Sequence, residues 1–198
     1  MVDVAKVRMF GQYIGTFVWD DSYRVARFEY DNDFVGKGIE PSPIMMPVQQ
    51  GRIYSFGSLN WDTFNGLPGM LADSLPDTYG RALFDQWLTL TGRTTSNPVE
   101  SLCFLGQRCM GALEFEPATG PSSDANMKFE IDTLIDVARE DLYKKKDFGV
   151  NLDVDRKAAI AEILRLGTSA GGQRAKAIIA YNKETGEVRS GQISAPEG

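Results

Sequence analysis

Val4-Ala-Lys-Val-Arg-Met-Phe-Gly-Gln-Tyr-Ile-Gly-Thr-Phe17 opens the chain with the alternating apolar and polar residues of half-buried β-strands. Val7 and Met9 on one side, and Ile14 and Phe17 on the other, flank Gly11-Gln12, which we interpret as a tight turn. Residues 24–30 continue the alternation, and acidic and amide side chains with turn chemistry follow them. The sequence therefore predicts an antiparallel meander of three strands at the N-terminus.

Two helices and two further strands are expected before residue 117. One helix begins near Pro76, with Ser74 or Asp73 as its cap and Gly92 as its end. Asn97-Pro-Val-Glu100 has the cap, the proline and the acidic first turn of a second helix. The remaining expectations are strands at 51–56 and 110–116, an extended, edge-like or irregular segment at 39–47, and a loop with packed aromatic rings at 60–69.

Residues 117–126 are a linker by composition, because they are rich in Pro, Gly, Ser and Asp and have no periodicity. We therefore expect a first part at residues 1–120 and a second part at residues 121–198. Helices are expected at 131–146 and 153–166, and a hairpin is expected at 177–190. The predicted fold class is α+β, with an N-terminal antiparallel β-rich subdomain that carries two packed helices, followed by the linker, the helices and the hairpin.

The composition limits the classes of function. The 198 residues carry a net charge of -6, which argues against direct binding to nucleic acid or to an anionic membrane surface. The sequence has no histidine, so catalytic triads and zinc sites built on histidine are excluded. Cys103 and Cys109 are expected to be reduced thiols, and the N-terminus has no apolar signal core, so we expect a cytoplasmic protein.

Thr168-Ser-Ala-Gly-Gly-Gln-Arg-Ala-Lys176 is the candidate binding segment, because small residues let backbone N–H groups approach an anion closely. A Walker loop is excluded, since Gln173 and Arg174 stand where Lys and Ser/Thr are required. The expected order of elements is also reversed, with a helix before the loop and a strand after it. Loop-then-strand is the arrangement of kinase nucleotide lids, and a plain helix-to-strand turn is the alternative.

Two further segments carry a resemblance to a known family. They are Phe64-Asn-Gly-Leu-Pro-Gly-Met-Leu-Ala-Asp-Ser-Leu-Pro-Asp-Thr-Tyr-Gly-Arg81 and Leu105-Gly-Gln-Arg-Cys-Met-Gly-Ala-Leu-Glu-Phe115. Together with Phe28-Glu-Tyr-Asp31 and the glycine-rich loop at 167–176, they resemble the N-terminal half of HipA-like toxin kinases in order and approximate spacing. The resemblance implies that residues 1–120 are the family's N-terminal subdomain, and that residues 121–198 contain the opening of a kinase-like N-lobe.

The resemblance also implies an activity and its ligands. The parent protein would be a serine/threonine protein kinase that transfers the γ-phosphate of ATP to a protein substrate with Mg²⁺, and its partner would be a small DNA-binding HipB-like antitoxin. The implied ATP-binding residues are Thr168, Ser169, Ala170, Gly171, Gly172, Gln173, Arg174 and Lys176. Thr168 and Ser169 are the hydroxyls that correspond to an autophosphorylation site of the family.

No catalytic and no metal-binding residue of the family is found in these 198 residues, so we expect the chain alone to be inactive. The alternative interpretation is a stand-alone interaction module that binds and restrains a separate kinase. Asp73, Ser74 and Asp77 bring two carboxylates and a hydroxyl close together in sequence, but helix capping explains them more simply than catalysis does.

Overall fold

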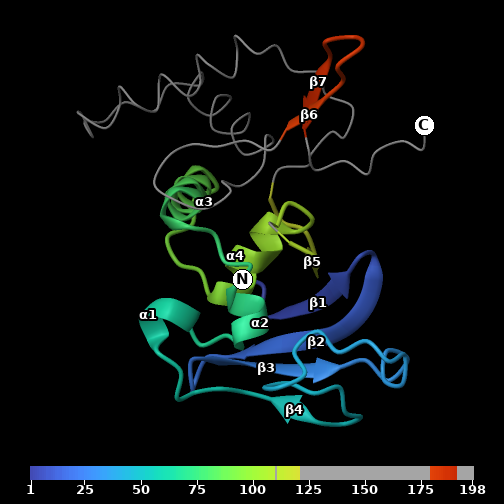
Figure 1. Cartoon of the computed structure of the whole chain (residues 1–198). Coiled ribbons are helices and arrows are strands. Elements are labelled where there is room, and N and C mark those ends of the chain that lie inside the picture. Colours follow the sequence, from blue (N-terminus) through green and yellow to red (C-terminus); the bar gives the residue numbers. More distant parts are fainter. Residues whose placement is uncertain (110, 121–178, 191–198) are drawn as a thin grey trace. The chain divides into compact units, whose positions relative to one another are not determined.

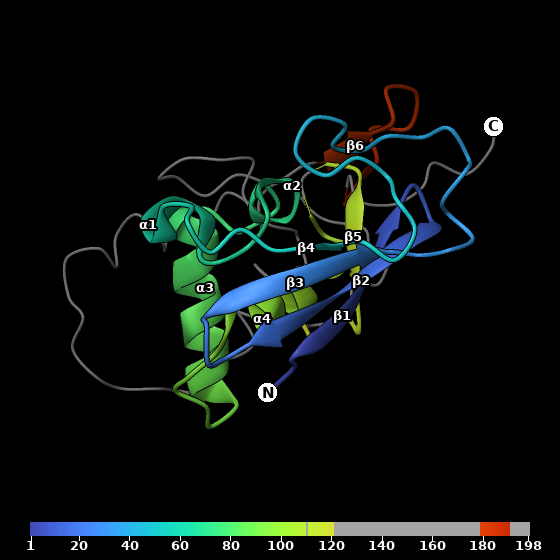
Figure 2. The same ribbon diagram turned by 90° about the horizontal axis from the view of Figure 1, so that it is seen from below.

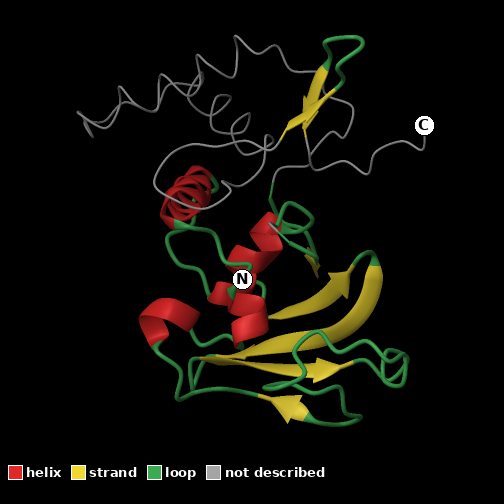
Figure 3. Ribbon diagram, in the orientation of Figure 1, coloured by secondary structure: helices red, strands yellow, loops and turns green. Residues whose placement is uncertain are grey.

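The computed structural model describes residues 1–109, 111–120 and 179–190 of the chain. These residues have the expected α+β composition, with a five-stranded antiparallel sheet and short helices (Figure 1 and Figure 3). The order across the sheet is β4-β3-β2-β1-β5. Its strands are β1 (Val4–Met9), β2 (Gln12–Asp20), β3 (Val25–Tyr30), β4 (Ile53–Tyr54) and β5 (Leu113–Glu116). The helices are α1 (Trp61–Phe64), α2 (Gly69–Ala72), α3 (Thr78–Leu90) and α4 (Pro98–Leu105), and the hairpin strands are β6 (Ile179–Tyr181) and β7 (Val188–Ser190).

The chain divides into two compact units. The first consists of residues 1–75 and 95–120 and holds the sheet with α1, α2 and α4. The second consists of residues 76–94 and 121–198 and includes α3 and the β6–β7 hairpin. Of the two helices expected to pack in the β-rich part, α4 lies in the first unit and α3 is grouped with the second. The sequence-based division after residue 120 stays a prediction.

The N-terminal meander is confirmed, but its first turn lies one residue earlier than predicted. Met9 pairs with Gln12, so the two residues between them, Phe10 and Gly11, form the turn. Both have positive φ, 51° and 74°, as a two-residue turn that follows the twist of the strands requires. Glycine meets this requirement at the second position, and Gln12 is therefore a strand residue and not part of the turn.

A β-bulge in β2 explains how two core residues three positions apart face the same side. Ile14 and Phe17 would point to opposite faces of a regular strand. The pairing with β1 shifts between Val7 and Arg8, so that Val7 lies opposite Gly15 and Arg8 opposite Tyr13. The extra residue is Ile14, and both Ile14 and Phe17 are fully buried.

The hydrophobic core lies between one face of the sheet and the helices of the first unit. Figure 2 shows α4 behind the strands. From this helix Val99, Leu102 and Cys103 are fully buried in the core cluster. The sheet contributes aromatic rings, and Phe17 contacts Phe115 edge to face with ring centroids 5.9 Å apart. The second strand of the unit, β2, and its last strand, β5, are thereby joined through the same core.

The start of α4 follows its sequence signal. The side-chain oxygen of Asn97 accepts a hydrogen bond from the backbone N–H of Glu100 at 2.9 Å, and Pro98 occupies the first helical position. By contrast, the loop predicted at 60–69 contains α1 and the start of α2. Asn60 caps α1 through the N–H of Thr63, and the chain leaves α1 at Asn65 with a left-handed φ of 50°. The cap at Asn60 was not recognised in the sequence.

The cap predicted for α3 was also wrong in position. The helix begins at Thr78, and Asp77 accepts a hydrogen bond from the N–H of Gly80 at 2.8 Å. Ser74 and Asp73 precede the helix by several residues, and Asp73 instead follows the last turn of α2. Pro76 therefore lies just outside α3, since the chain enters the helix only after Asp77 in an extended conformation.

The segment between β3 and β4 is irregular, as expected from its three prolines. It is tied to the core by Met46, which is buried and whose carbonyl oxygen accepts a hydrogen bond from the Tyr30 hydroxyl at 2.9 Å. The Tyr54 hydroxyl donates to the carbonyl oxygen of Pro47 in the same way. These two tyrosines fix the return of the chain into β4, which lies within the strand predicted at 51–56.

Candidate functional site

The predicted ATP-binding residues lie outside the described residues. These are Thr168, Ser169, Ala170, Gly171, Gly172, Gln173, Arg174 and Lys176, of which Thr168 and Ser169 are also the predicted autophosphorylation residues. What the structure describes is the element that follows them. β6 begins at Ile179, shortly after Lys176, and pairs with β7 in antiparallel register, Tyr181 opposite Val188. The expected hairpin after the loop is confirmed, and the nucleotide-binding role of the loop stays a prediction.

The turn of this hairpin is built by local interactions. The side-chain oxygen of Asn182 accepts hydrogen bonds from the backbone N–H groups of Glu184 at 2.9 Å and Thr185 at 3.1 Å. The N–H of Gly186 donates to the carbonyl oxygen of Asn182 at 2.9 Å. An asparagine side chain that mimics a backbone turn in this way makes the hairpin largely independent of distant contacts.

In the first family-like segment, residues 64–81, four residues have a role in the fold. Leu67 and Leu71 are fully buried in the core of the first unit. Gly66 lies where a Cβ atom would clash with the carbonyl oxygen of Arg24 and approach the Trp61 ring to 2.9 Å. Asp77 caps α3. The capping interpretation is confirmed for Asp77, and packing explains Gly66, Leu67 and Leu71.

The second family-like segment is organised by a buried arginine. Arg108 is 4% exposed, and its guanidinium donates to the carbonyl oxygens of Phe104 and Leu105 in the last turn of α4. A positive group suits the negative end of a helix dipole. Burial lowers the pKa of Arg108 to about 10, which still leaves the group charged at neutral pH. The sequence did not single out this residue as buried, because arginine is usually exposed.

The chain that leaves β5 folds back over the same helix end. The N–H of Thr119 donates to the carbonyl oxygen of Cys103 at 2.8 Å, and a Cβ atom on Gly120 would overlap the Arg108 guanidinium. Thr119 and Arg108 together satisfy the carbonyl groups of Cys103, Phe104 and Leu105, which the end of α4 leaves without helical partners. This arrangement holds residues 119 and 120 against the end of α4.

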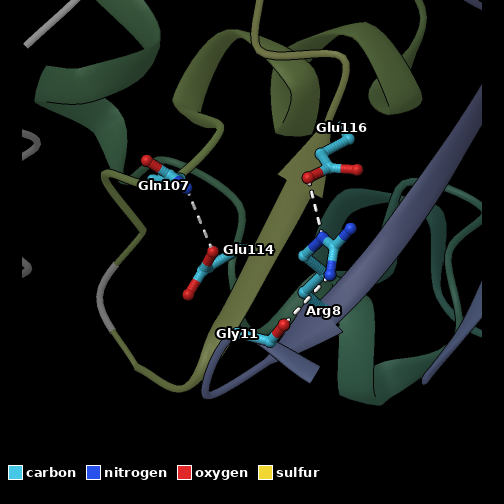
Figure 4. Close-up of polar contacts among 5 residues, drawn as sticks. All are labelled: Arg8, Gly11, Gln107, Glu114 and Glu116. Atoms are coloured by element: carbon cyan, nitrogen blue, oxygen red, sulfur yellow. Dashed lines mark hydrogen bonds and ion pairs between the residues drawn. The ribbon is translucent and has the colours of Figure 1, made fainter. Parts of the chain in front are cut away.

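A polar cluster on β1 and β5 lies at the surface (Figure 4). Arg8 Nε donates to Glu116 Oε1 at 2.7 Å, and its Nη1 donates to the carbonyl oxygen of Gly11 at 3.0 Å. Gln107 donates to Glu114 at 3.3 Å. The contacts of Arg8 link the turn after β1 to the last strand of the sheet, and a structural role explains them most simply.

No group of three or more His, Cys, Asp or Glu residues that could hold a metal ion occurs in the described part of the chain. Cys103 and Cys109 are free thiols, as predicted. Burial raises the pKa of each to about 12, so neither is an activated nucleophile. Within the same described ranges, no helix is long and apolar enough to cross a membrane.

Comparison with known proteins gives one match that covers more than half of the chain. The family model of the HipA N-terminal domain matches residues 5–116, from the second residue of β1 to the last residue of β5. The matched region thus begins and ends with the first and last strands of the five-stranded sheet. No curated protein matches the chain.

Proposed function

The chain belongs to the HipA N-terminal domain family, and from this membership we propose that it is the N-terminal part of a HipA-like serine/threonine protein kinase toxin. The observation that carries the proposal is the family match at residues 5–116, followed in the sequence by the glycine-rich loop and in the structure by the β6–β7 hairpin. A loop of small residues ahead of a strand suits the backbone N–H contacts that hold nucleotide phosphates.

In this proposal the loop residues 168–176 contact the phosphates of ATP, with Mg²⁺ held by residues of the parent protein. Arg174 and Lys176 add positive charge beside the loop. Phosphorylation of Thr168 or Ser169 would place nearly two negative charges next to these cations and reorder the loop. The partner is a small DNA-binding HipB-like antitoxin, which leaves DNA contact to a second protein and agrees with the acidic charge of this chain.

A nucleotide titration tests this function. In the longest natural form of the protein, ATP with Mg²⁺ should raise the melting temperature, because a ligand that binds only the folded state stabilises it. Lys176→Ala should reduce the shift, while Lys183→Ala, an exposed lysine on the turn between β6 and β7, serves as the matched control and should leave it unchanged. No ATP-dependent shift in that form, or an equal loss in both variants, would contradict the nucleotide role.

One structural observation favours a second candidate, an interaction module that restrains a separate kinase. The matched residues contain the five-stranded sheet and its hydrophobic core, with members from Ala5 to Phe115. A region with its own core suits a separately folding domain. Mixing residues 1–120 with a kinase of the family supplied as a separate chain tests this candidate. Inhibition of that kinase would favour the module, and no effect would favour the kinase fragment.

A further inference from the structure

Asn65–Gly66 is the only Asn-Gly dipeptide among the 198 residues. The two residues lie in the link between α1 and α2 (Figure 1) and have φ values of 50° and 75°. Asparagine and glycine tolerate this left-handed region better than other residues, so the pair suits the exit of a helix. Asn65 is half-buried and Gly66 is buried.

In a flexible chain this dipeptide reacts with water. The backbone nitrogen of Gly66 attacks Cγ of Asn65 and loses its proton, the new C–N bond closes a five-membered succinimide, and the side-chain amide leaves as ammonia. Water then opens one of the two carbonyl groups of the ring, which gives aspartate or isoaspartate. The balance is asparagine and water in, and acid and ammonia out, with no other reactant. Glycine favours the attack because it has no Cβ beside the nitrogen.

The folded backbone holds the reacting atoms apart. Closure of the ring requires Cβ of Asn65 and the nitrogen of Gly66 to be nearly eclipsed about the bond between Cα and the carbonyl carbon. The ψ of Asn65 is 34°, which places these two atoms nearly anti to each other in an L-residue. The attack therefore cannot occur in the conformation that the structure shows, and ψ must first turn through most of a half circle.

Contacts on the far side of the bond oppose this rotation. Leu67 donates its N–H to the carbonyl oxygen of Phe64 at 2.8 Å, and Ala26 in β3 donates its N–H to the carbonyl oxygen of Gly66 at 2.8 Å. Leu67 is also fully buried in the core. Rotation about ψ of Asn65 moves Gly66 and Leu67 relative to α1, so these bonds must break before the ring can close.

We propose that Asn65–Gly66 is a latent deamidation site, which the fold keeps unreactive and which reacts with water only in molecules whose α1–α2 link has opened. The reaction then prevents the return to the fold. Isoaspartate adds a methylene group to the main chain beside Gly66, where an atom at the Cβ position would already clash with the carbonyl oxygen of Arg24. Molecules that have opened are thereby marked covalently and kept from refolding.

Peptide mapping by mass spectrometry tests the site on the full 198-residue chain. The chain and the free peptide acetyl-Phe-Asn-Gly-Leu-Pro-amide are incubated in parallel at pH 8, and conversion of the asparagine to aspartate or isoaspartate is followed with time. If only open molecules react, the rate is that of the peptide multiplied by the open fraction. We expect the folded chain to react more than about tenfold more slowly than the peptide, and the chain unfolded in guanidinium to match it.

Two asparagine caps provide matched variants. Asn60→Ala removes the oxygen that accepts the N–H of Thr63 at the start of α1, and should make the reaction at Asn65 about fivefold faster because the link opens more often. Asn182→Ala removes the oxygen that accepts the N–H of Glu184 in the turn between β6 and β7, and should leave the rate unchanged. Equal acceleration in both variants, or reaction of the folded parent chain at the rate of the peptide, would overturn protection by the α1–α2 link. No reaction at Asn65 even in guanidinium would show that it is not a deamidation site.

A refolding experiment tests the consequence separately. Chains converted in guanidinium are returned to buffer, and circular dichroism is measured on the isoaspartate and unconverted fractions. The unconverted fraction should refold and the isoaspartate fraction should not, whereas native spectra from both would overturn the marking role. Asn65→Asp controls for the new charge and should refold, since its main chain is unchanged. Failure of Asn65→Asp to refold would attribute the loss to the charge and overturn the role of the added methylene group.

Discussion

Asn97 Nδ2 donates a hydrogen bond to Asp3 Oδ1 at 2.7 Å and so joins the start of α4 to the residue before β1. The same amide nitrogen donates to the carbonyl oxygen of Val2 at 3.1 Å, while the amide oxygen caps the helix. One buried side chain therefore satisfies both a helix end and the N-terminal backbone.

Replacing Asn97 by alanine should destabilise the first unit strongly. Loss of the cap costs about 1–2 kcal/mol, and the Val2 and Asp3 acceptors lose their donor in addition. Urea unfolding measures the change in the free energy of unfolding. Asn60→Ala is the control, because Asn60 caps the exposed four-residue helix α1 and has no second role of this kind. If Asn97→Ala lowers the free energy of unfolding by no more than Asn60→Ala does, the link between Asn97 and the N-terminus contributes nothing to stability.

Gly66→Ala should be among the most damaging single changes in the first unit. The added methyl group would meet the carbonyl oxygen of Arg24 and the Trp61 ring, and φ is already 75°. We expect a loss of about 3 kcal/mol, from overpacking and backbone strain together. Gly36→Ala is the matched control, since Gly36 has φ 88° but no atom within 4 Å of the position that a Cβ atom would take. In thermal or urea unfolding, Gly36→Ala should lower the free energy of unfolding by only about 1 kcal/mol, the cost of a left-handed backbone for alanine.

Because its two thiols are buried, we expect the folded chain to lose stability in alkali. Burial raises the pKa of Cys103 and Cys109 from 9.0 to about 12. Between these values the unfolded chain has released the thiol protons and the folded chain still holds them, so stability falls as the pH rises above 9. Melting temperatures measured from pH 8 to pH 10.5 should therefore decline more steeply in the parent chain than in the Cys103→Ala, Cys109→Ala double variant.

A thiol-labelling experiment checks the same point independently. Native protein at pH 8 should react with a disulfide reagent far more slowly than protein unfolded in guanidinium, because only the thiolate attacks. Rapid labelling of Cys103 in the folded chain would show that this thiol is either accessible or ionised, against its complete burial in the core.

The Arg8–Glu116 ion pair should contribute little to stability. The two side chains are 34% and 41% exposed, so solvent screens their attraction. A double-mutant cycle with Arg8→Ala and Glu116→Ala should give a coupling energy below about 1 kcal/mol. Added salt should reduce it further. A larger, salt-insensitive coupling would show that the link between Arg8 and the Gly11 carbonyl makes the cluster cooperative.

Several elements could be predicted from the residues alone, because their causes are local. Asn97 and Pro98 start α4 through contacts within one turn, and Asn182 and Gly186 form the turn between β6 and β7 within five residues. The three N-terminal strands follow from alternating polarity and short connections. In each case the interacting groups are close in sequence, so few alternative partners compete.

Other features depend on residues far apart in the chain, which no local pattern specifies. A strand was expected near residues 110–116, but its position beside β1 follows from the shared core, as in the contact between Phe17 and Phe115. Arg24 contacts residues about 40 positions later in the chain, since its carbonyl oxygen lies close to Gly66 and its guanidinium stacks on Trp61. Arg108 is buried because the end of α4 and the returning chain at Gly120 enclose it. Local polarity and capping thus define which segments are strands and helices, while long-range packing determines which side chains become buried, strained or available for binding, since those properties depend on which distant atoms fill the surrounding space.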